Sequence, residues 1–288
     1  MKHLHKRRRG FNAIELVVVI LIVFLLLGVI LVILPKPRAP SAMGQTMNNL
    51  KQLSLACHSA NHVFKRIPPA FDQYGDMNFP ASVHVHLLPF MEQDNLHKMY
   101  LAQEGKGDWD QHVIPEFICP IDFTQTKNGG GVQNLAANLR VFSDKGMATR
   151  YDANLPALAE IEPSKAQIPN SFPDGISNTI FFTTKYANCK NGGSRFTADP
   201  TSPFAAFLGQ NAALVRAHPS DPTGTFQDVP SKDQCLIHPL MAQSMTGGRL
   251  IIGLGDGSIR TITSSLNPLT WNLLMQPNDG MKLGDDWE

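Results

Sequence analysis

A single carboxylate stands near the start of a long apolar run. Glu15 follows Phe11 by four positions, and no polar side chain occurs from Leu16 to Leu34. A carboxylate within a membrane-spanning helix costs free energy, so a Glu that is kept there usually has a partner. If the chain were cut after Gly10, the new α-amine of Phe11 would lie on the helical face of Glu15. A neighbouring copy could supply that amine too, so the spacing predicts pairing between a carboxylate and an amine.

The segment that positions Glu15 is predicted to be a membrane-spanning helix. As a helix, residues 16–34 would extend about 28 Å, close to the hydrocarbon thickness of a bilayer. A secretory signal peptide has a shorter apolar region that ends at a small-residue cleavage site, and only residues 39–42 resemble such a site. Basic residues precede the run at Lys2, Lys6, Arg7, Arg8 and Arg9, and follow it at Lys36 and Arg38. This bias predicts a cytoplasmic N-terminus and an extracytoplasmic remainder.

The stretch GFNAIE, residues 10–15, closely resembles the signal of type IV prepilins and pseudopilins. The resemblance implies that a prepilin peptidase cuts between Gly10 and Phe11 and N-methylates Phe11. It also implies that Glu15 pairs with the N-terminal amine of an adjacent subunit, and that the apolar helix serves as a stalk for assembly. Asn12 and Ala13 stand where the family commonly has Thr and Leu. The alternative is a plain signal-anchor in which Glu15 is incidental.

The chain beyond the apolar run is divided by a proline-rich stretch. PKPRAPSA, residues 35–42, is predicted to be a stiff, extended linker, because proline removes amide donors and disfavours helix before it. Ser41 could cap a second helix whose apolar positions recur every three or four residues. These positions are Met43, Met47, Leu50, Leu53, Cys57, Ala60 and Phe64.

Several blocks of the remaining sequence resemble a large pseudopilin-like family, the domain of unknown function 1559. The blocks are NNLKQL from residue 48, PPAF from 68, FICPID from 117, DGISNTIFF from 174 and GGRLIIGLGDGSIRTITSSLNPLTWNLLMQPNDG at 247–280. Met245 stands where the family commonly has His, and Thr184 where an acid often follows the SNT strand. If either position has a chemical role in the family, this chain has lost it.

The predicted fold is α+β: a long N-terminal transmembrane or stalk helix, then a pilin-like globular domain with an antiparallel sheet and long loops. Residues 250–254 and 258–262 flank Gly-Asp-Gly, which predicts a hairpin, and residues 178–184 indicate another strand. Residues 128–173 are predicted to be long loops over the sheet. The predicted parts are a basic leader (1–10), the helix (11–34), the linker (35–42) and the globular domain (43–288).

Cysteine and histidine positions leave several kinds of site open. Cys189 and Cys235 are the favoured disulfide pair among four cysteines, because both lie in loop-like sequence in a compartment predicted to be oxidising. Cys57, His58 and His62 could hold a metal on one helix, but solvated or packing histidines are commoner. His84 and His86 alternate on a predicted strand and so share one polar face. The acids Asp279, Asp285, Asp286 and Glu288 could bind calcium or form a solvated terminus.

Other classes of function find no support in the sequence. Motifs of serine hydrolases, zinc proteases and nucleotide-binding loops are absent, and GLGDG at residues 253–257 lacks dinucleotide-binding spacing. Without its leader the chain has 20 basic and 24 acidic residues, which does not favour nucleic-acid binding. We therefore expect no enzyme, cofactor or bound metal. The expected partners are the peptidase, the lipid bilayer of the cytoplasmic membrane and other pilin-like subunits.

Two functions remain open. The first is a structural protein that is processed as a prepilin and assembled into a type II secretion pseudopilus or a pilus-like structure. The second is a membrane-tethered extracytoplasmic binding domain that never polymerises. The linker favours the second, because a joint separates head from stalk, whereas Glu15 favours the first, because assembly gives it a partner.

Overall fold

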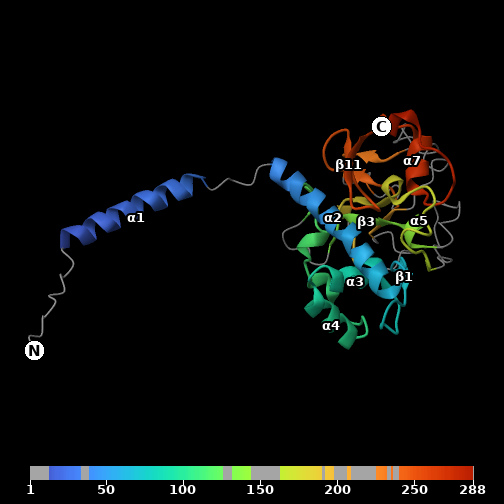
Figure 1. Ribbon diagram of the computed structural model, residues 1–288, viewed down its shortest axis with the longest axis horizontal. Helices are drawn as coiled ribbons and strands as arrows, with labels where there is room; N and C mark the ends of the chain where they lie inside the picture. The colour runs from blue at the N-terminus through green and yellow to red at the C-terminus, as the bar shows by residue number, and fades with distance from the viewer. Residues whose placement is uncertain are drawn as a thin grey trace, which may run out of the picture. The chain divides into compact units, whose positions relative to one another are not determined.

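The computed structural model describes residues 13–33, 39–125, 132–143, 163–189, 192–197, 206–208, 225–231, 235 and 240–287. The chain divides into two compact units, Met1–Ser41 and Ala42–Glu288 (Figure 1). Each unit is described by itself.

The described residues contain both helices and strands, which confirms the predicted α+β class. The α-helices are α1 (Ala13–Ile33), α2 (Ala39–Phe64), α3 (Val83–Leu87), α4 (Asp94–Ala102), α5 (Leu139–Phe142) and α7 (Pro268–Met275). Short 3-10 helices are η1 (Leu88–Phe90), η2 (Trp109–Gln111), η3 (Pro115–Phe117), η4 (Ile176–Asn178) and η5 (Asp285–Trp287). The strands are β1 (Phe71–Asp72), β2 (Ala81–Ser82), β3 (Leu135–Asn138), β4 (Ile180–Thr184), β5 (Asn188–Cys189), β6 (Gly192–Gly193), β7 (Phe207–Leu208), β8 (Gln227–Asp228), β9 (Gln243–Ser244), β10 (Arg249–Leu254) and β11 (Ile259–Thr263).

Helix α1 carries Glu15 in its first turn. Among the helices that the structure describes, none is long and apolar enough to cross a membrane. The membrane-spanning helix therefore stays a prediction.

Helix α2 buries the predicted apolar stripe. Leu50, Leu53, Cys57 and Ala60 are completely buried, and Met43, Met47 and Phe64 pack at the edge of the same core. The helix ends at Phe64, followed by Lys65 with a φ of 58°. A residue in the left-handed region is a common helix terminator.

The predicted linker is wrong in its second half. Helix α2 begins at Ala39, so Ser41 lies inside the helix and does not precede it as a cap. Proline is tolerated in the first turn of a helix, where its missing amide would have no intrahelical partner. Pro40 therefore does not prevent the helix, and residues 35–38 lie outside the described part of the chain.

The main sheet has the order β11-β10-β4-β3-β7 among the described strands. The first four strands pair antiparallel, whereas β7 runs parallel to β3, so the sheet is mixed and not purely antiparallel. Strand β3 and helix α5 lie in the stretch that was predicted to be loops. Strand β3 reads Leu-Ala-Ala-Asn and is buried at every position, so it lacks the polar alternation that marks a half-exposed strand.

Helices cover both faces of this sheet. From β10, Ile251 packs into the core that contains the α2 stripe. Its neighbours Leu250 and Ile252 pack into a second core with Trp271 of α7. Alternation along a strand sends successive side chains to opposite faces, so β10 separates the two cores. Figure 1 shows α7 and α2 at different sides of the globular domain.

The predicted hairpin is confirmed. Strands β10 and β11 pair antiparallel, with Arg249 opposite Thr263 and Gly253 opposite Ile259. In the turn, Gly257 has a φ of 83°, which glycine adopts without a Cβ clash. Asp256 Oδ1 accepts a hydrogen bond from the Ser258 amide at 2.8 Å.

Replacing Gly255 by alanine should destabilise the globular domain. A Cβ at this position would lie 2.8 Å from Cζ of the buried Phe181 and 2.9 Å from the Ile176 carbonyl oxygen. Overpacking of this kind typically costs about 1–3 kcal/mol. Chemical denaturation of the full chain in detergent measures the loss. Gly247→Ala is the matched control, since its Cβ meets nothing within 4 Å, and equal stability of both variants would contradict the argument.

Candidate functional site

The predicted processing segment is only partly described. Gly10 and Phe11, which flank the predicted cut, lie outside the described residues. Glu15 is exposed in the first turn of α1. A carboxylate in that position is stabilised by the positive end of the helix dipole.

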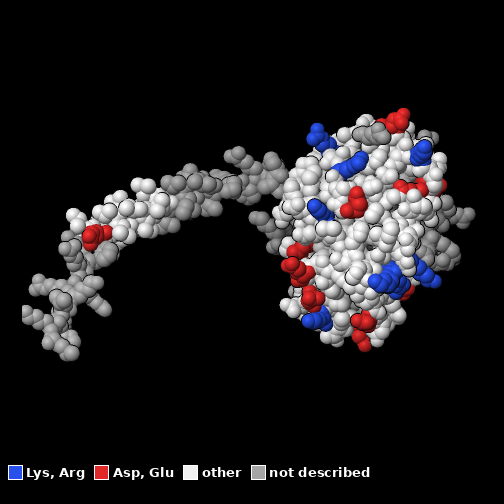
Figure 2. Space-filling view, in the orientation of Figure 1, with Lys and Arg blue, Asp and Glu red and all other residues white. Residues whose placement is uncertain are grey.

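Beyond Glu15, the described surface of α1 is apolar on all sides. The described side chains from Leu16 to Leu26 are exposed, with Phe24 at 70% and Ile20 at 47%. Figure 2 shows the described part of this helix as uncharged apart from one acidic side chain near its start. A helix that is apolar on every face is suited to a buried or lipid environment, because in water all of its apolar faces would be exposed to solvent.

Cys189 and Cys235 form a disulfide with a Cα–Cα distance of 5.7 Å. The other two cysteines, Cys57 and Cys119, are free and buried. Burial raises the pKa of both thiols, to about 11 in Cys119, where the hydroxyl of Thr46 lies 3.2 Å from the sulfur. Neither thiol is therefore activated as a nucleophile.

Cys57, His58 and His62 do not converge. Cys57 is completely buried in the core. His58 places Nε2 2.6 Å from the Gly255 carbonyl oxygen and so ties α2 to the hairpin turn. His62 is exposed. Within the described ranges, no group of three or more His, Cys, Asp or Glu could hold a metal ion.

The strand predicted for His84 and His86 is wrong, because both residues lie in the short helix α3. Ser82 caps this helix, with its hydroxyl accepting from the Val85 amide, and the cap overrides the β-branched pattern. Both imidazoles are buried and not on a polar face. His84 Nε2 lies 3.1 Å from the Leu135 carbonyl and His86 Nε2 lies 2.8 Å from the Asp72 carbonyl.

The FICPID block takes part in a buried hydrogen-bond network around Asp122. Asp122 Oδ2 accepts from the Asn134 side-chain amide at 3.0 Å and from the Ala187 amide at 2.7 Å. Asn134 Oδ1 in turn accepts from the Cys119 amide. A buried carboxylate is stable when several donors satisfy it. These hydrogen bonds join the Cys119 loop to Ala187, which directly precedes β5, the strand that contains Cys189.

The acidic C-terminal tail is built into the fold. Asp286 Oδ2 accepts from the Asn267 amide and Oδ1 accepts from the Thr270 hydroxyl, both at 2.6 Å, at the start of α7. These hydrogen bonds hold the pKa of Asp286 below its usual value. Asp279 donates its amide to Asp174 Oδ2 at 2.7 Å. Asp285 and Asp286 are exposed, as predicted for a solvated terminus, although Asp286 is also hydrogen-bonded to the start of α7. Asp279 is partly buried, and Glu288 lies outside the described residues.

Two carboxylates thus fix the tail at its two ends. Asp174, in the loop before η4, accepts the Asp279 amide and also the Gly280 amide at 2.9 Å. Asp286 holds the other end against α7. The intervening residues 280–285 are positioned against the sheet, where Leu283 packs on the second core.

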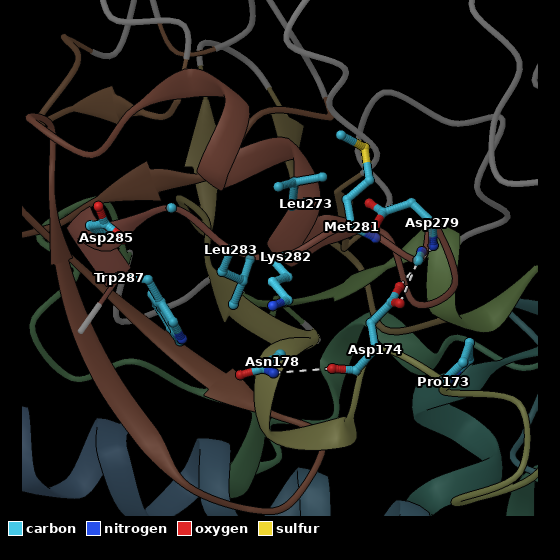
Figure 3. A pocket seen from close by; sticks show the side chains of 12 residues that line it. Pro173, Asp174, Asn178, Leu273, Asp279, Met281, Lys282, Leu283, Asp285 and Trp287 are labelled. Carbon is cyan, nitrogen blue, oxygen red and sulfur yellow. Dashed lines mark hydrogen bonds between the residues drawn. The ribbon is translucent and has the colours of Figure 1, made fainter.

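A pocket of about 440 Å³ lies between this tail and the loop before η4 (Figure 3). Its lining combines an aromatic ring, an amide, charges of both signs and aliphatic groups. The residues that contribute these groups are Asn178, Leu273, Lys282, Leu283 and Trp287, with the acids Asp174, Asp279 and Asp285. Asn178 donates its side-chain amide to the Asp174 carbonyl at 3.0 Å, which fixes the orientation of the amide. The volume is in the range of small-molecule pockets.

The indole of Trp287 forms one wall of the pocket and lies between two hollows. The Arg260 guanidinium lies 4.4 Å from the ring centroid, a cation–π distance, and its Nη1 donates to the Trp287 carbonyl at 3.3 Å. Trp287 also lines a second hollow of about 380 Å³ on the side of Arg260. Trp287 is therefore held in place although it is the last described residue.

Sequence reasoning missed this pocket. Asn178 was assigned to a strand over residues 178–184, Asp174 was noted only within a family block, and Trp287 was passed over in a tail examined only for its acids. The available signal was the Asp-Gly-x-x-Asn spacing before a strand, which predicts a turn with two local side-chain hydrogen bonds. Nothing local to either segment indicates that they meet, because they lie more than 100 positions apart, as the Asp174–Gly280 contact shows.

The comparisons with known proteins bear on the globular part. A family model described as a protein of unknown function (DUF1559) matches residues 44–269, which is well over half of the chain. No curated protein and no solved structure matches. The match begins after α1 and ends before the tail that forms one side of the pocket.

Proposed function

The chain belongs to this family of proteins of unknown function (DUF1559), and from that premise we propose that it is a membrane-anchored, pseudopilin-like structural protein. In this proposal a prepilin peptidase removes residues 1–10 and N-methylates Phe11. The mature chain is anchored in the cytoplasmic membrane by its N-terminal helix, with the globular domain outside the cytoplasm. Assembly with other pilin-like subunits takes place through the apolar helix, and no enzymatic step is required.

The observation that carries the proposal is the combination of Glu15 with the apolar surface of α1. From Leu16 to Leu26, α1 has no polar face that could be turned towards water. In the sequence the apolar run continues to Leu34, and the basic residues lie before it. This arrangement fits anchoring in lipid with a cytoplasmic N-terminus.

The disulfide supports an extracytoplasmic globular domain. Disulfides persist in oxidising compartments and are rare in the cytosol. The Cys189–Cys235 bond lies in the globular unit, which the proposed topology places outside.

Processing can be tested by the mass and N-terminal sequence of the membrane-extracted protein. Co-expression with a prepilin peptidase should give a chain that begins at N-methyl-Phe11. Gly10→Leu should leave the Met1 start intact, because the residue before the cut is changed. Gly28→Leu is the matched control, a glycine within the apolar run that should not affect the cut. An intact wild-type chain, or a cut near Ala42, would contradict the proposal.

Assembly can be tested separately with Glu15→Ala. If Glu15 pairs with the amine of a neighbouring subunit, the variant should be cut normally but should lose most crosslinked multimers in the membrane. Glu15→Asp, which keeps the charge, should retain part of them. Multimers at the wild-type level in Glu15→Ala would remove the assembly role from Glu15.

A second function, a tethered binding domain that does not polymerise, is favoured by one observation. The chain divides at Ser41 into two compact units, and the globular unit carries the pocket lined by Trp287. Under this function the wild-type protein is processed at Phe11 but gives no multimers.

A further inference from the structure

The lining of the pocket beside Trp287 contains hydrogen-bonding groups of opposite kinds. Asn178 uses one of its two side-chain N–H groups on the Asp174 carbonyl, so its oxygen and its second N–H are left for a ligand. Lys282 brings an ammonium donor and Asp285 a carboxylate acceptor. In Figure 3, Lys282 and Asn178 lie on the same side of Trp287, with Leu283 between Lys282 and the indole.

Carboxylates outnumber cationic groups in the lining. Asp174, Asp279 and Asp285 line the pocket beside Lys282, so a ligand carboxylate or phosphate would be repelled. Hydroxyl groups suit this lining, because a hydroxyl can donate to a carboxylate and accept from an ammonium. The lining therefore favours a hydroxyl-rich ligand without negative charge.

The indole adds a requirement for an apolar face. Trp287 is held by the Arg260 guanidinium and by packing on the second core, so little side-chain freedom remains to be lost on binding. An aromatic ring presents a flat apolar surface and gains most from a partner that is also flat and apolar on one side. A ring-shaped polyol has such a face of C–H groups, with hydroxyls around its rim.

We propose that the pocket formed by Trp287, Asn178, Lys282 and Asp285 binds a neutral sugar ring, stacked on the indole with its hydroxyls on the three polar side chains. The proposal goes beyond the structural role above and is independent of processing and assembly. Asp174 lines the pocket, but both of its carboxylate oxygens accept backbone amides of the tail, so it acts as a positioning residue. Asp286 is a positioning residue as well, because it holds the other end of the tail against α7.

The protein carries a built-in probe for this proposal. Its three tryptophans are Trp109, Trp271 and Trp287, and the first two are buried, with exposures of 4% and 0%. Trp287 is partly exposed. Quenching of tryptophan fluorescence by acrylamide in the full chain, in detergent, therefore reports mainly on Trp287.

The experiment measures protection of Trp287 by defined compounds. Glucose, galactose, N-acetylglucosamine and cellobiose test the neutral class, and glutamate, inorganic phosphate and putrescine test the charged classes. We expect saturable protection by at least one neutral sugar at millimolar concentration and none by the charged compounds. Soluble dextran distinguishes a sugar unit of a polysaccharide from a free sugar as the ligand. If dextran protects Trp287 as well as glucose does at the same concentration of glucose units, units within a polysaccharide bind. If only free sugars protect it, the ligand is a small solute.

Variants assign the effect to the pocket. Because Trp287→Ala removes the fluorescent probe, sugar binding by this variant is measured by saturation-transfer NMR. The Kd should rise at least about tenfold. Asn178→Ala and Asp285→Ala should weaken it less, by about three- to tenfold, since each removes one hydrogen-bonding group. Trp109→Phe is the matched control and should bind as the wild type does.

Three results would overturn the proposal. The first is an absence of protection by all neutral sugars. The second is protection by putrescine, glutamate or phosphate in their place. The third is sugar binding that survives Trp287→Ala unchanged. None of these results depends on whether Phe11 is the mature N-terminus. The sugar-binding proposal and the proposed function are therefore tested independently of each other.

Discussion

Replacing Cys189 and Cys235 together by serine should lower the free energy of unfolding by about 4 kcal/mol. The two cysteines are 46 positions apart, and a cross-link that closes a loop of this length restricts the unfolded chain by about that amount in the chain-entropy model. The effect is a large share of the stability of an ordinary domain, which is about 5–15 kcal/mol.

Chemical denaturation of the full chain in detergent, with and without a thiol reductant, measures this difference. The wild-type protein should fall to the stability of the double variant when it is unfolded and refolded with reductant. The double variant should be indifferent to reductant, which serves as the internal control. A wild-type protein whose midpoint does not respond to reduction would show that the bond does not stabilise the fold.

Local patterns were sufficient where one segment determines its own structure. The stripe of α2 was predictable because a helix that lies on a core repeats its apolar positions every three or four residues. The hairpin of β10 and β11 was predictable because Asp256 and Gly257 form a turn that needs a positive φ at Gly257. In both cases the signal and the structure occupy the same residues.

Prediction failed where the structure depends on distant contacts. Strand β3 is buried on both faces, so Ala136 and Ala137 show no alternation. The parallel pairing of β7 with β3 follows from register across the sheet and leaves no mark in Phe207 or Leu208. The pocket requires Asp174 to meet Gly280, and no periodicity within either segment encodes that meeting.

The histidines of α3 show the same limit. Alternation of Val and His predicted a strand with a polar face, but Ser82 begins a helix and both imidazoles enter the core. His84 lies among aromatic rings, with centroids 5.5 Å from Phe117 and 5.8 Å from Phe207. Burial lowers the pKa of His84 to about 3, and burial lowers that of His86 to about 4, in spite of their carbonyl partners.

These depressed pKa values predict a steep loss of stability in acid. The unfolded chain takes up protons on both imidazoles as the pH falls through about 6.5, whereas the folded protein does not until about pH 3–4. The stability is therefore complete above pH 6.5 and is lost as the pH falls toward the folded pKa values. At pH 5 each histidine should cost about 2 kcal/mol, so the pair should cost about 4 kcal/mol relative to pH 7.5.

The difference between the free energies of unfolding at pH 7.5 and pH 5 isolates this effect from other consequences of substitution. His84→Leu and His86→Leu should each remove about 2 kcal/mol of that difference, and the double variant should remove most of it. Either variant is also expected to be less stable at both pH values, because a buried carbonyl loses its hydrogen-bond partner, at Leu135 or at Asp72.

Phe207→Leu provides the matched control for the histidine variants. It removes an aromatic neighbour of His84 and leaves a smaller side chain in the same core, so it should lower stability by a similar amount at both pH values. No titratable group is lost, and the difference between the two pH values should stay near that of the wild-type protein. If His84→Leu keeps the full pH dependence, His84 does not lie neutral in the core, and the acid sensitivity must come from other groups, such as His86 or carboxylates that the folded state holds ionised.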